Sequence, residues 1–226
     1  MKRMFIFFAV FLFCISCSNK SDSTRPVILD AITTKLWGLP GVTAVNEYPE
    51  TGHFESVIEV IFTQPVDHNN PSGATFTQKI YIGHVDENLP VVYETEGYSR
   101  PSFRTRELAP AMQCNQISVE HRFNGESKPS PLDWQYLTIK QAADDLHAIY
   151  SALKSIYSGK WVSSGRSKGG DTAIFYRRFY PNDMDATVAF VAPVLFSARD
   201  RRINNYMNNA GTQDCRDNIK AFQRAI

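Results

Sequence analysis

The sequence has 226 residues, of which 43% are hydrophobic and 12% are aromatic, so it can bury the core of one domain. Its formal net charge of +1 excludes recognition of nucleic acid or of an anionic membrane through bulk electrostatics. The H-E-x-x-H, G-x-G-x-x-G and P-loop patterns do not occur, so no metal or other cofactor is predicted.

Residues 1–17 are predicted to be a bacterial lipoprotein signal peptide. A positively charged start precedes the apolar segment 5–15, which is too short to span a bilayer comfortably. A small residue followed by Cys17 then resembles a lipobox, in which the cysteine becomes the lipidated first residue of the mature chain. Cys14 stands where a lipobox usually has leucine, so the alternative is an ordinary secretory signal that is cut nearby.

Residues 18–50 are predicted to form a polar tether and an irregular lead-in that contains three prolines. The predicted location is the periplasm or the cell surface, where the lipid on Cys17 anchors the chain to a bacterial membrane. Export implies an oxidising compartment. Cys114 and Cys215 would there either form a disulfide or remain free, buried thiols, because the sequence does not place their Cα atoms.

From residue 51 onward the pattern changes to strands and helices. Segments 54–62 and 75–83 are rich in β-branched and aromatic residues and flank a turn-rich segment, which predicts an antiparallel hairpin. Strands and helices then alternate, which is typical of a parallel sheet with helices on both faces. The strands are expected at 89–93, 116–120, 161–164 and 186–194, and the helices at 104–112, 138–156 and 169–180. A mostly parallel sheet with an antiparallel start predicts the α/β-hydrolase fold.

The predicted hydrolase domain spans residues 51–196 and is followed at 197–226 by the start of a helical cap. A helical pattern from residue 216 reaches the end of the sequence without a stop signal. The domain is therefore expected to be truncated on its C-terminal side.

The segment Gly165-Arg166-Ser167-Lys168-Gly169 has the G-x-S-x-G pattern of a nucleophile elbow. In such an elbow a strand turns sharply into a helix, and the glycines keep Cβ atoms out of the crowded turn. The expected nucleophile is Ser167, and the backbone N–H of Lys168 is the expected oxyanion donor. The pattern alone could mark a Gly-Ser surface turn, but its place between a predicted strand and a predicted helix favours the elbow.

A second oxyanion donor is expected in the loop 94–100, which follows a predicted strand. Gly97 permits close approach of the backbone, so the N–H of Tyr98, or that of Gly97, is the candidate donor. The alternative is that Gly97 only turns the chain.

Four segments together resemble the secreted prolyl tripeptidyl aminopeptidases and, more distantly, the prolyl carboxypeptidase and dipeptidyl peptidase II group. They are QPVDH at 64–68, ETEGY at 94–98, EHRFNGES at 120–127 and GRSKGGDTA at 165–173. The resemblance extends over about residues 50–195. It implies a Ser-Asp-His peptidase that releases short peptides, such as tripeptides, from free N-termini, often after proline.

An exopeptidase of this kind needs fixed anions to hold the ammonium group of its peptide substrate. Glu94 and Glu96 lie in the loop beside the expected oxyanion hole, and Glu120 follows a strand close to the elbow. These three glutamates are the expected substrate-binding residues. The alternative for Glu120 is a structural ion pair with Arg122.

The triad partners in this fold follow the order Ser, then Asp or Glu, then His. All five histidines precede Ser167, and His121, which ends a strand near the elbow, comes in the wrong order. The acid and the histidine are therefore expected in an absent C-terminal segment, and the fragment alone is expected to be inactive. Two other interpretations are an esterase or lipase of the same fold, and a catalytically inactive lipoprotein that only binds. The sequence gives no indication of oligomeric state.

Overall fold

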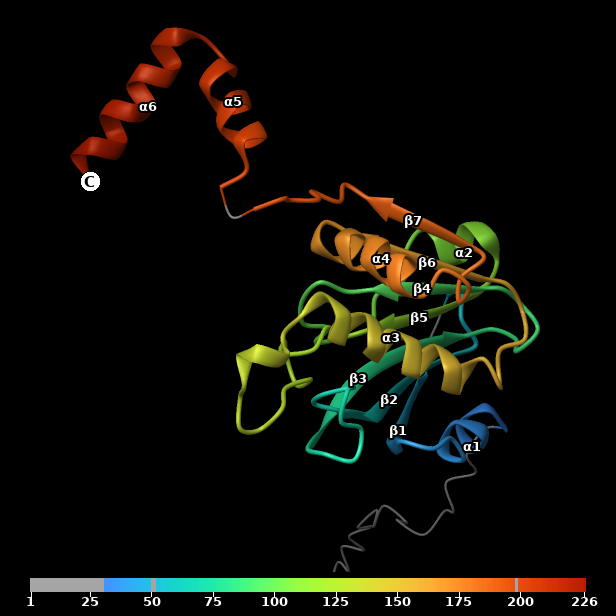
Figure 1. Cartoon of the computed structure of the whole chain (residues 1–226). Coiled ribbons are helices and arrows are strands. Elements are labelled where there is room, and N and C mark those ends of the chain that lie inside the picture. Colours follow the sequence, from blue (N-terminus) through green and yellow to red (C-terminus); the bar gives the residue numbers. More distant parts are fainter. Residues whose placement is uncertain (1–30, 50–51, 198) are drawn as a thin grey trace, which may run out of the picture.

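The computed structural model describes residues 31–49, 52–197 and 199–226 (Figure 1). The predicted signal peptide, its lipidation at Cys17 and the polar part of the tether lie outside the described residues. Within the described part of the chain, no helix is both long and apolar enough to cross a membrane.

The seven-stranded sheet is antiparallel at one end and parallel at the other, in the order β1-β2-β3-β5-β4-β6-β7. Antiparallel pairing joins β1 to β2, β2 to β3 and β3 to β5, and parallel pairing joins β5, β4, β6 and β7. The strands are β1 (Val42–Pro49), β2 (Ser56–Pro65), β3 (Thr75–His84), β4 (Val91–Thr95), β5 (Asn115–Val119), β6 (Trp161–Arg166) and β7 (Ala186–Phe190). The predicted hairpin and the predicted parallel half of the sheet are both confirmed.

The prediction of an irregular lead-in is wrong for residues 31–49, which form helix α1 (Ala31–Trp37) and edge strand β1. Ile32 and Leu36 stand one helical turn apart, and both are buried in the core on one face of the sheet. Pro49 ends the edge strand, a position where the missing N–H of proline disturbs no interior ladder. Proline content therefore misled the prediction, because a proline at the end of a strand does not break it.

Helices cover both faces of the sheet (Figure 1). The core on one face joins α1, α3 and α4 to the sheet, and a smaller cluster on the other face includes Ala109 of α2. The bounds are α2 (Leu108–Met112), α3 (Ile139–Leu153) and α4 (Lys168–Phe179). Thr138 caps α3, since its side chain accepts a hydrogen bond from the N–H of Gln141 at 3.2 Å.

Helix α2 is shorter than the predicted helix at 104–112. The side chain of Gln116 explains the difference, because it engages the backbone just before α2. Its amide donates to the carbonyl of Arg104 at 2.8 Å, and its carbonyl oxygen accepts from the N–H of Arg106 at 2.7 Å. These bonds satisfy backbone groups in a non-helical conformation, so the helix starts later.

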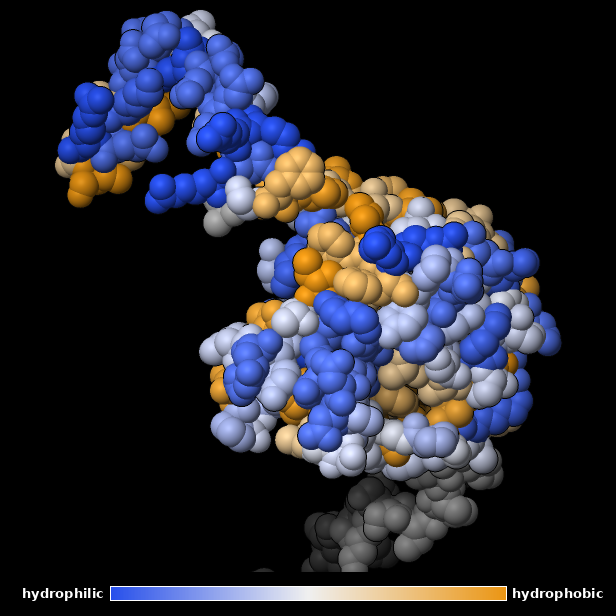
Figure 2. All heavy atoms as spheres, in the orientation of Figure 1, coloured by the Kyte–Doolittle hydropathy of each residue, from blue (hydrophilic) through white to orange (hydrophobic). Residues whose placement is uncertain are grey.

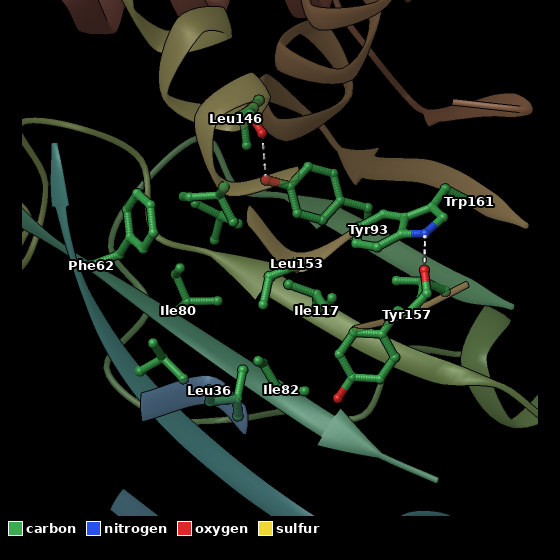
Figure 3. Packing of buried hydrophobic residues seen from close by; sticks show 14 of the residues in the cluster. Leu36, Phe62, Ile80, Ile82, Tyr93, Ile117, Leu146, Leu153, Tyr157 and Trp161 are labelled. Atoms are coloured by element: carbon green, nitrogen blue, oxygen red, sulfur yellow. Dashed lines mark hydrogen bonds between the residues drawn. The ribbon is translucent and has the colours of Figure 1, made fainter. Parts of the chain in front are cut away.

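Aromatic side chains organise the core between the parallel strands and the helices (Figure 3). The rings of Tyr93 and Trp161 meet edge to face with their centroids 5.6 Å apart. The Tyr93 hydroxyl donates to the carbonyl of Leu146 at 3.0 Å, and the Trp161 indole donates to the carbonyl of Tyr157 at 3.2 Å. Each buried polar atom on these rings thus has a partner, and β4, β6 and α3 are fixed relative to one another.

The chain leaves the sheet after β7, which ends at Phe190 rather than at the predicted residue 194. Val191 and Val194 both have a φ of 44°, which is incompatible with an extended strand. Helices α5 (Arg201–Asn209) and α6 (Gln213–Ala225) then stand away from the sheet and hold no buried residue (Figure 1). Apolar side chains gather where the chain leaves the sheet (Figure 2), and those of Val191 and Phe196 are each 78% exposed.

Candidate active site

A single residue, Ser167, connects strand β6 to helix α4. Strand β6 ends at Arg166 and helix α4 begins at Lys168, as the elbow pattern predicts. Ser167 has φ 55° and ψ −126°, which is a strained conformation for a residue with a side chain. The residue is exposed to solvent. The turn therefore presents a hydroxyl group at the end of the sheet where the parallel strands terminate.

The glycines of the elbow are required by close packing. A Cβ atom on Gly165 would lie 2.2 Å from the carbonyl oxygen of Gly169, and one on Gly169 would lie 2.5 Å from the carbonyl oxygen of Thr95. The hydroxyl oxygen of Thr95 lies 3.1 Å from the carbonyl oxygen of Ser164 and 2.9 Å from the carbonyl oxygen of Gly169. Thr95 thus ties β4 to both sides of the turn, a role that the sequence did not indicate.

The loop after β4 passes directly against the first turn of α4. A Cβ atom on Gly97 would lie 2.6 Å from the Cβ atom of Lys168 and 2.7 Å from the backbone nitrogen of Gly169. Gly97 therefore serves close approach rather than only a turn. The next residue, Tyr98, has its ring centroid 4.9 Å from the ammonium nitrogen of Lys168. The two segments that carry the expected oxyanion donors are thus in contact at the start of a helix, where the first N–H groups have no partner within the helix.

A cavity of about 280 Å³ lies beside Lys168, between the N-terminal parts of α3 and α4. Its apolar lining comes from Leu137, Ile139, Ala142, Ala143 and Phe175. Three charged or titratable side chains also line it, those of His121, Lys168 and Asp171. An apolar chamber with a few polar groups next to an exposed hydroxyl is the arrangement expected of a small-molecule or peptide subsite.

His121 contributes a neutral ring to this cavity. Its Nδ1 lies 2.8 Å from the carbonyl oxygen of Arg122, which can only accept, so Nδ1 carries the proton. Burial lowers the pKa of His121 to about 4. The ring is therefore uncharged near neutral pH, and Nε2 is left as an acceptor.

Two of the three glutamates expected to bind substrate are held by neighbouring side chains. Glu96 forms ion pairs with Arg100 and Arg106, each at 3.0 Å. Glu94 is buried; burial raises its pKa, and a hydrogen bond with Ser164 partly opposes that rise. Glu96 already faces two cations, so it offers little attraction for an ammonium group.

The third glutamate, Glu120, is 1% exposed and supports the backbone of two loops. Its Oε1 accepts from the N–H groups of Glu126 and Ser127 at 2.9 and 3.0 Å and from the Ser127 hydroxyl at 2.8 Å. Its Oε2 accepts from the N–H of Arg100 at 2.5 Å. These bonds contradict the expected substrate-binding role. They also contradict the alternative ion pair, because Arg122 pairs with a different carboxylate.

Arg122 forms a buried network with two residues from distant segments. Its guanidinium binds Asp145 of α3 through two hydrogen bonds, Nε to Oδ2 at 2.7 Å and Nη2 to Oδ1 at 2.9 Å. Nε2 of His68 lies 2.7 Å from Asp145 Oδ1. The network joins segments 64–68 and 120–127, and the sequence offered no sign of it beyond their occurrence in one chain.

Among the described residues, no histidine contacts the Ser167 hydroxyl. Apart from His121 and His68, the rings of His53, His84 and His147 bind the Cys114 carbonyl, the Tyr157 hydroxyl and Asp183, respectively. The described residues also contain no cluster of His, Cys, Asp or Glu that could hold a metal ion. Cys114 and Cys215 are free thiols rather than a disulfide, but only Cys114 is buried, and Cys215 is exposed.

Comparisons with known proteins agree with this geometry. The sequence model of the PS-10 peptidase S37 family matches residues 25–226. A prolyl tri/tetrapeptidyl aminopeptidase of Streptomyces mobaraensis is 40% identical over 195 residues, which are 85% of this chain and 40% of that protein. A thymus-specific serine protease of Mus musculus is 32% identical over 149 residues, covering 58% of this chain and 29% of that protein. The chain thus spans less than half the length of these relatives.

Among solved structures, an acetyl xylan esterase from Paenibacillus sp. R4 superimposes with a TM-score of 0.50 at 17% identity, covering 85% of this chain and 64% of that one. Likeness at this level of identity concerns the fold alone. Together with the mixed sheet and its helices, it confirms the predicted α/β-hydrolase fold.

Proposed function

The chain belongs to the PS-10 peptidase S37 family, and we propose that it forms the nucleophile half of a serine exopeptidase that releases tripeptides from free N-termini. One observation carries this proposal: the single residue between β6 and α4, Ser167, has a strained backbone conformation and is exposed to solvent. Strained backbone conformations are concentrated at functional sites, and here the strained residue carries an exposed side chain directly before the first turn of a helix.

In the proposed reaction the Ser167 hydroxyl attacks the carbonyl carbon of the scissile peptide bond. The negative charge that develops on the carbonyl oxygen is stabilised by the N–H of Lys168, at the positive end of α4, and by the N–H of Tyr98. The close contact between Gly97 and α4 supports this pairing, because it joins the two segments that carry the proposed donors.

The proposal places the general base and its acid outside the described residues. A serine hydroxyl is a weak nucleophile without a base, and none of the described histidines forms a hydrogen bond with Ser167. The chain spans 40% of the aminopeptidase of Streptomyces mobaraensis, which leaves room for both groups in the rest of such a protein. These 226 residues alone are expected to hydrolyse peptides very slowly.

The apolar part of the cavity beside Lys168 supports a subsite for the residue that precedes the cut. Leu137, Ile139 and Phe175 offer apolar contact of the kind that a proline ring would use. The S37 relative that is named for prolyl substrates agrees with this assignment. Proline before the scissile bond is therefore part of the proposal.

The serine-hydrolase mechanism is tested by labelling the protein, expressed from its complete gene, with a fluorophosphonate probe. Such a probe modifies activated serines. We expect Ser167 to be labelled in the parent protein. Labelling should disappear in Ser167→Ala and persist in Ser155→Ala, which removes an exposed hydroxyl just beyond the C-terminal end of α3. An unlabelled parent protein would refute the serine-hydrolase mechanism.

Substrate class is tested on the same protein with matched compounds. A tripeptide ending in proline and followed by an amide bond should be cleaved faster with a free N-terminus than with an acetylated one. Faster turnover of simple esters, with no effect of acetylation, would instead identify an esterase of this fold.

We further propose that the protein is exported and anchored to a bacterial membrane by lipid on Cys17, as the lipobox-like sequence indicates. Metabolic labelling with a fatty-acid analogue should mark the parent protein and not Cys17→Ser. Equal labelling of both would reject the anchor.

A further inference from the structure

Lys168 occupies an electrostatically unfavourable position. It is the first residue of α4, where the helix dipole is positive and a cation is repelled. Its side chain is half-buried, and burial lowers the pKa of its ammonium group. No carboxylate of the described residues lies within ion-pair distance of it, although eleven other basic groups of that part of the chain have such partners.

The described groups around the Lys168 ammonium lie near it but do not form an ion pair with it. The ring of Tyr98, 4.9 Å away, supports a cation through its π face but carries no charge. The neighbouring His121 is neutral near pH 7, since burial lowers its pKa to about 4. Asp171 lines the same cavity, and its Oδ1 accepts a hydrogen bond from the N–H of Val194 at 3.0 Å. The cavity therefore contains a cation that has no direct ion-pair partner among the described residues, although the Asp171 carboxylate lines the same space.

We propose that the ammonium group of Lys168 binds a carboxylate of the peptide substrate, an inference that rests on the proposed peptidase function. An anion in this half-buried cavity would gain the charge-assisted hydrogen bond that Lys168 lacks in the free protein. The same cation repels the substrate N-terminus, which is therefore held elsewhere.

Two parts of a peptide could supply this carboxylate. One is the side chain of an acidic residue that replaces proline before the cut in some substrates, whose methylene groups would contact Leu137 and Phe175 in the cavity. The other is the free C-terminus of a short substrate, which lies one residue beyond the scissile bond in a tetrapeptide. Lys168 is adjacent in sequence to the nucleophile, so its side chain is within reach of groups on either side of the bond.

The test measures kcat/KM on two pairs of peptides with the protein expressed from its complete gene. One pair carries Glu or Gln before the scissile bond. The other carries proline there and ends in a free carboxylate or in an amide. In one of the two pairs, we expect kcat/KM to be about tenfold or more higher for the peptide with the additional carboxylate than for its neutral counterpart, because hydrogen bonds between charged groups are strong. The pair that shows the preference identifies the source of the carboxylate.

Lys168→Met should abolish that preference, and Lys168→Arg should retain part of it. Lys168→Gln is the second neutral variant should the methionine variant fold poorly. The matched control is Lys160→Met, which removes the same charge from an exposed side chain at the opposite end of β6 and should keep the preference. The ratio of two substrates on one variant is insensitive to a general loss of activity.

The inference is overturned if neither pair shows a preference in the parent protein, or if the preference survives in both neutral variants. In either case the neutral peptides would still be cleaved and Ser167 would still react with fluorophosphonate, so the proposed function would stand. If no peptide is cleaved, the proposed function fails and the inference falls with it.

Discussion

Gly97 and Lys168 are in such close contact that a Cβ atom on the glycine would lie 2.6 Å from the Cβ atom of the lysine. Real Cβ atoms do not approach so closely, so the two backbones can meet only because residue 97 has no side chain. The contact joins the loop after β4 to the first turn of α4, the two segments that hold the expected oxyanion donors.

Replacing Gly97 with alanine should therefore disturb the elbow. We expect Gly97→Ala to lower the free energy of unfolding by roughly 1–3 kcal/mol, as overpacked sites do, and to reduce fluorophosphonate labelling of Ser167. Gly38→Ala is the control, because its Cβ atom would meet its nearest neighbour, the Lys35 carbonyl oxygen, at 3.4 Å. Denaturant unfolding and probe labelling measure the two effects. Parent-like labelling of Gly97→Ala would show that the close approach is unnecessary.

The buried pair of Arg122 and Asp145 should be important for stability. Asp145→Ala leaves a fully buried guanidinium without its carboxylate, which costs about 3–5 kcal/mol in comparable sites. Glu87→Ala breaks the more exposed pair with Lys35 and should cost less than about 1 kcal/mol. Urea unfolding followed by circular dichroism compares the two variants. Similar losses in both would mean that burial of the Arg122 network adds nothing.

Stability should depend on pH through His121. Burial lowers the pKa of His121 from 6.5 to about 4, so between these pH values the unfolded chain binds a proton that the folded chain does not. The free energy of unfolding should therefore fall as the pH is lowered from 6.5 toward 4. In His121→Gln the fall in the free energy of unfolding that is due to His121 should be missing, while the pH dependence due to the other titratable groups remains. Parallel stability curves for the two proteins over this range would contradict the assignment.

The two free cysteines should differ in reactivity. Cys114 is buried, and burial raises the pKa of its thiol to about 11, whereas Cys215 is exposed on α6. A thiol reagent applied to the native protein is expected to modify Cys215 and to spare Cys114, with both modified in urea. Mass spectrometry of peptides distinguishes the sites. Rapid native labelling of Cys114 would show that α2 opens readily.

Local patterns predicted the elements that are strongly periodic or bounded by turn residues. The hairpin of β2 and β3, helix α3 and the turn at Ser167 all follow from residues close together in sequence. The errors occurred where a distant contact decides the local structure. Gln116 keeps the backbone before α2 out of a helix, and burial against the sheet orders the lead-in at Ile32 and Leu36.

In the candidate site, too, some residues could be predicted from local sequence, whereas others depend on contacts between distant segments. Ser167, Lys168 and their flanking glycines could be identified from the sequence, because an elbow is built by consecutive residues whose conformational limits are known. The roles of the acidic side chains could not, since a carboxylate is free or engaged according to neighbours that only folding supplies. Glu120 resembled a substrate ligand until four hydrogen bonds placed it inside the protein, and Lys168 became a candidate anion site only once the fold left it without a carboxylate partner among the described residues.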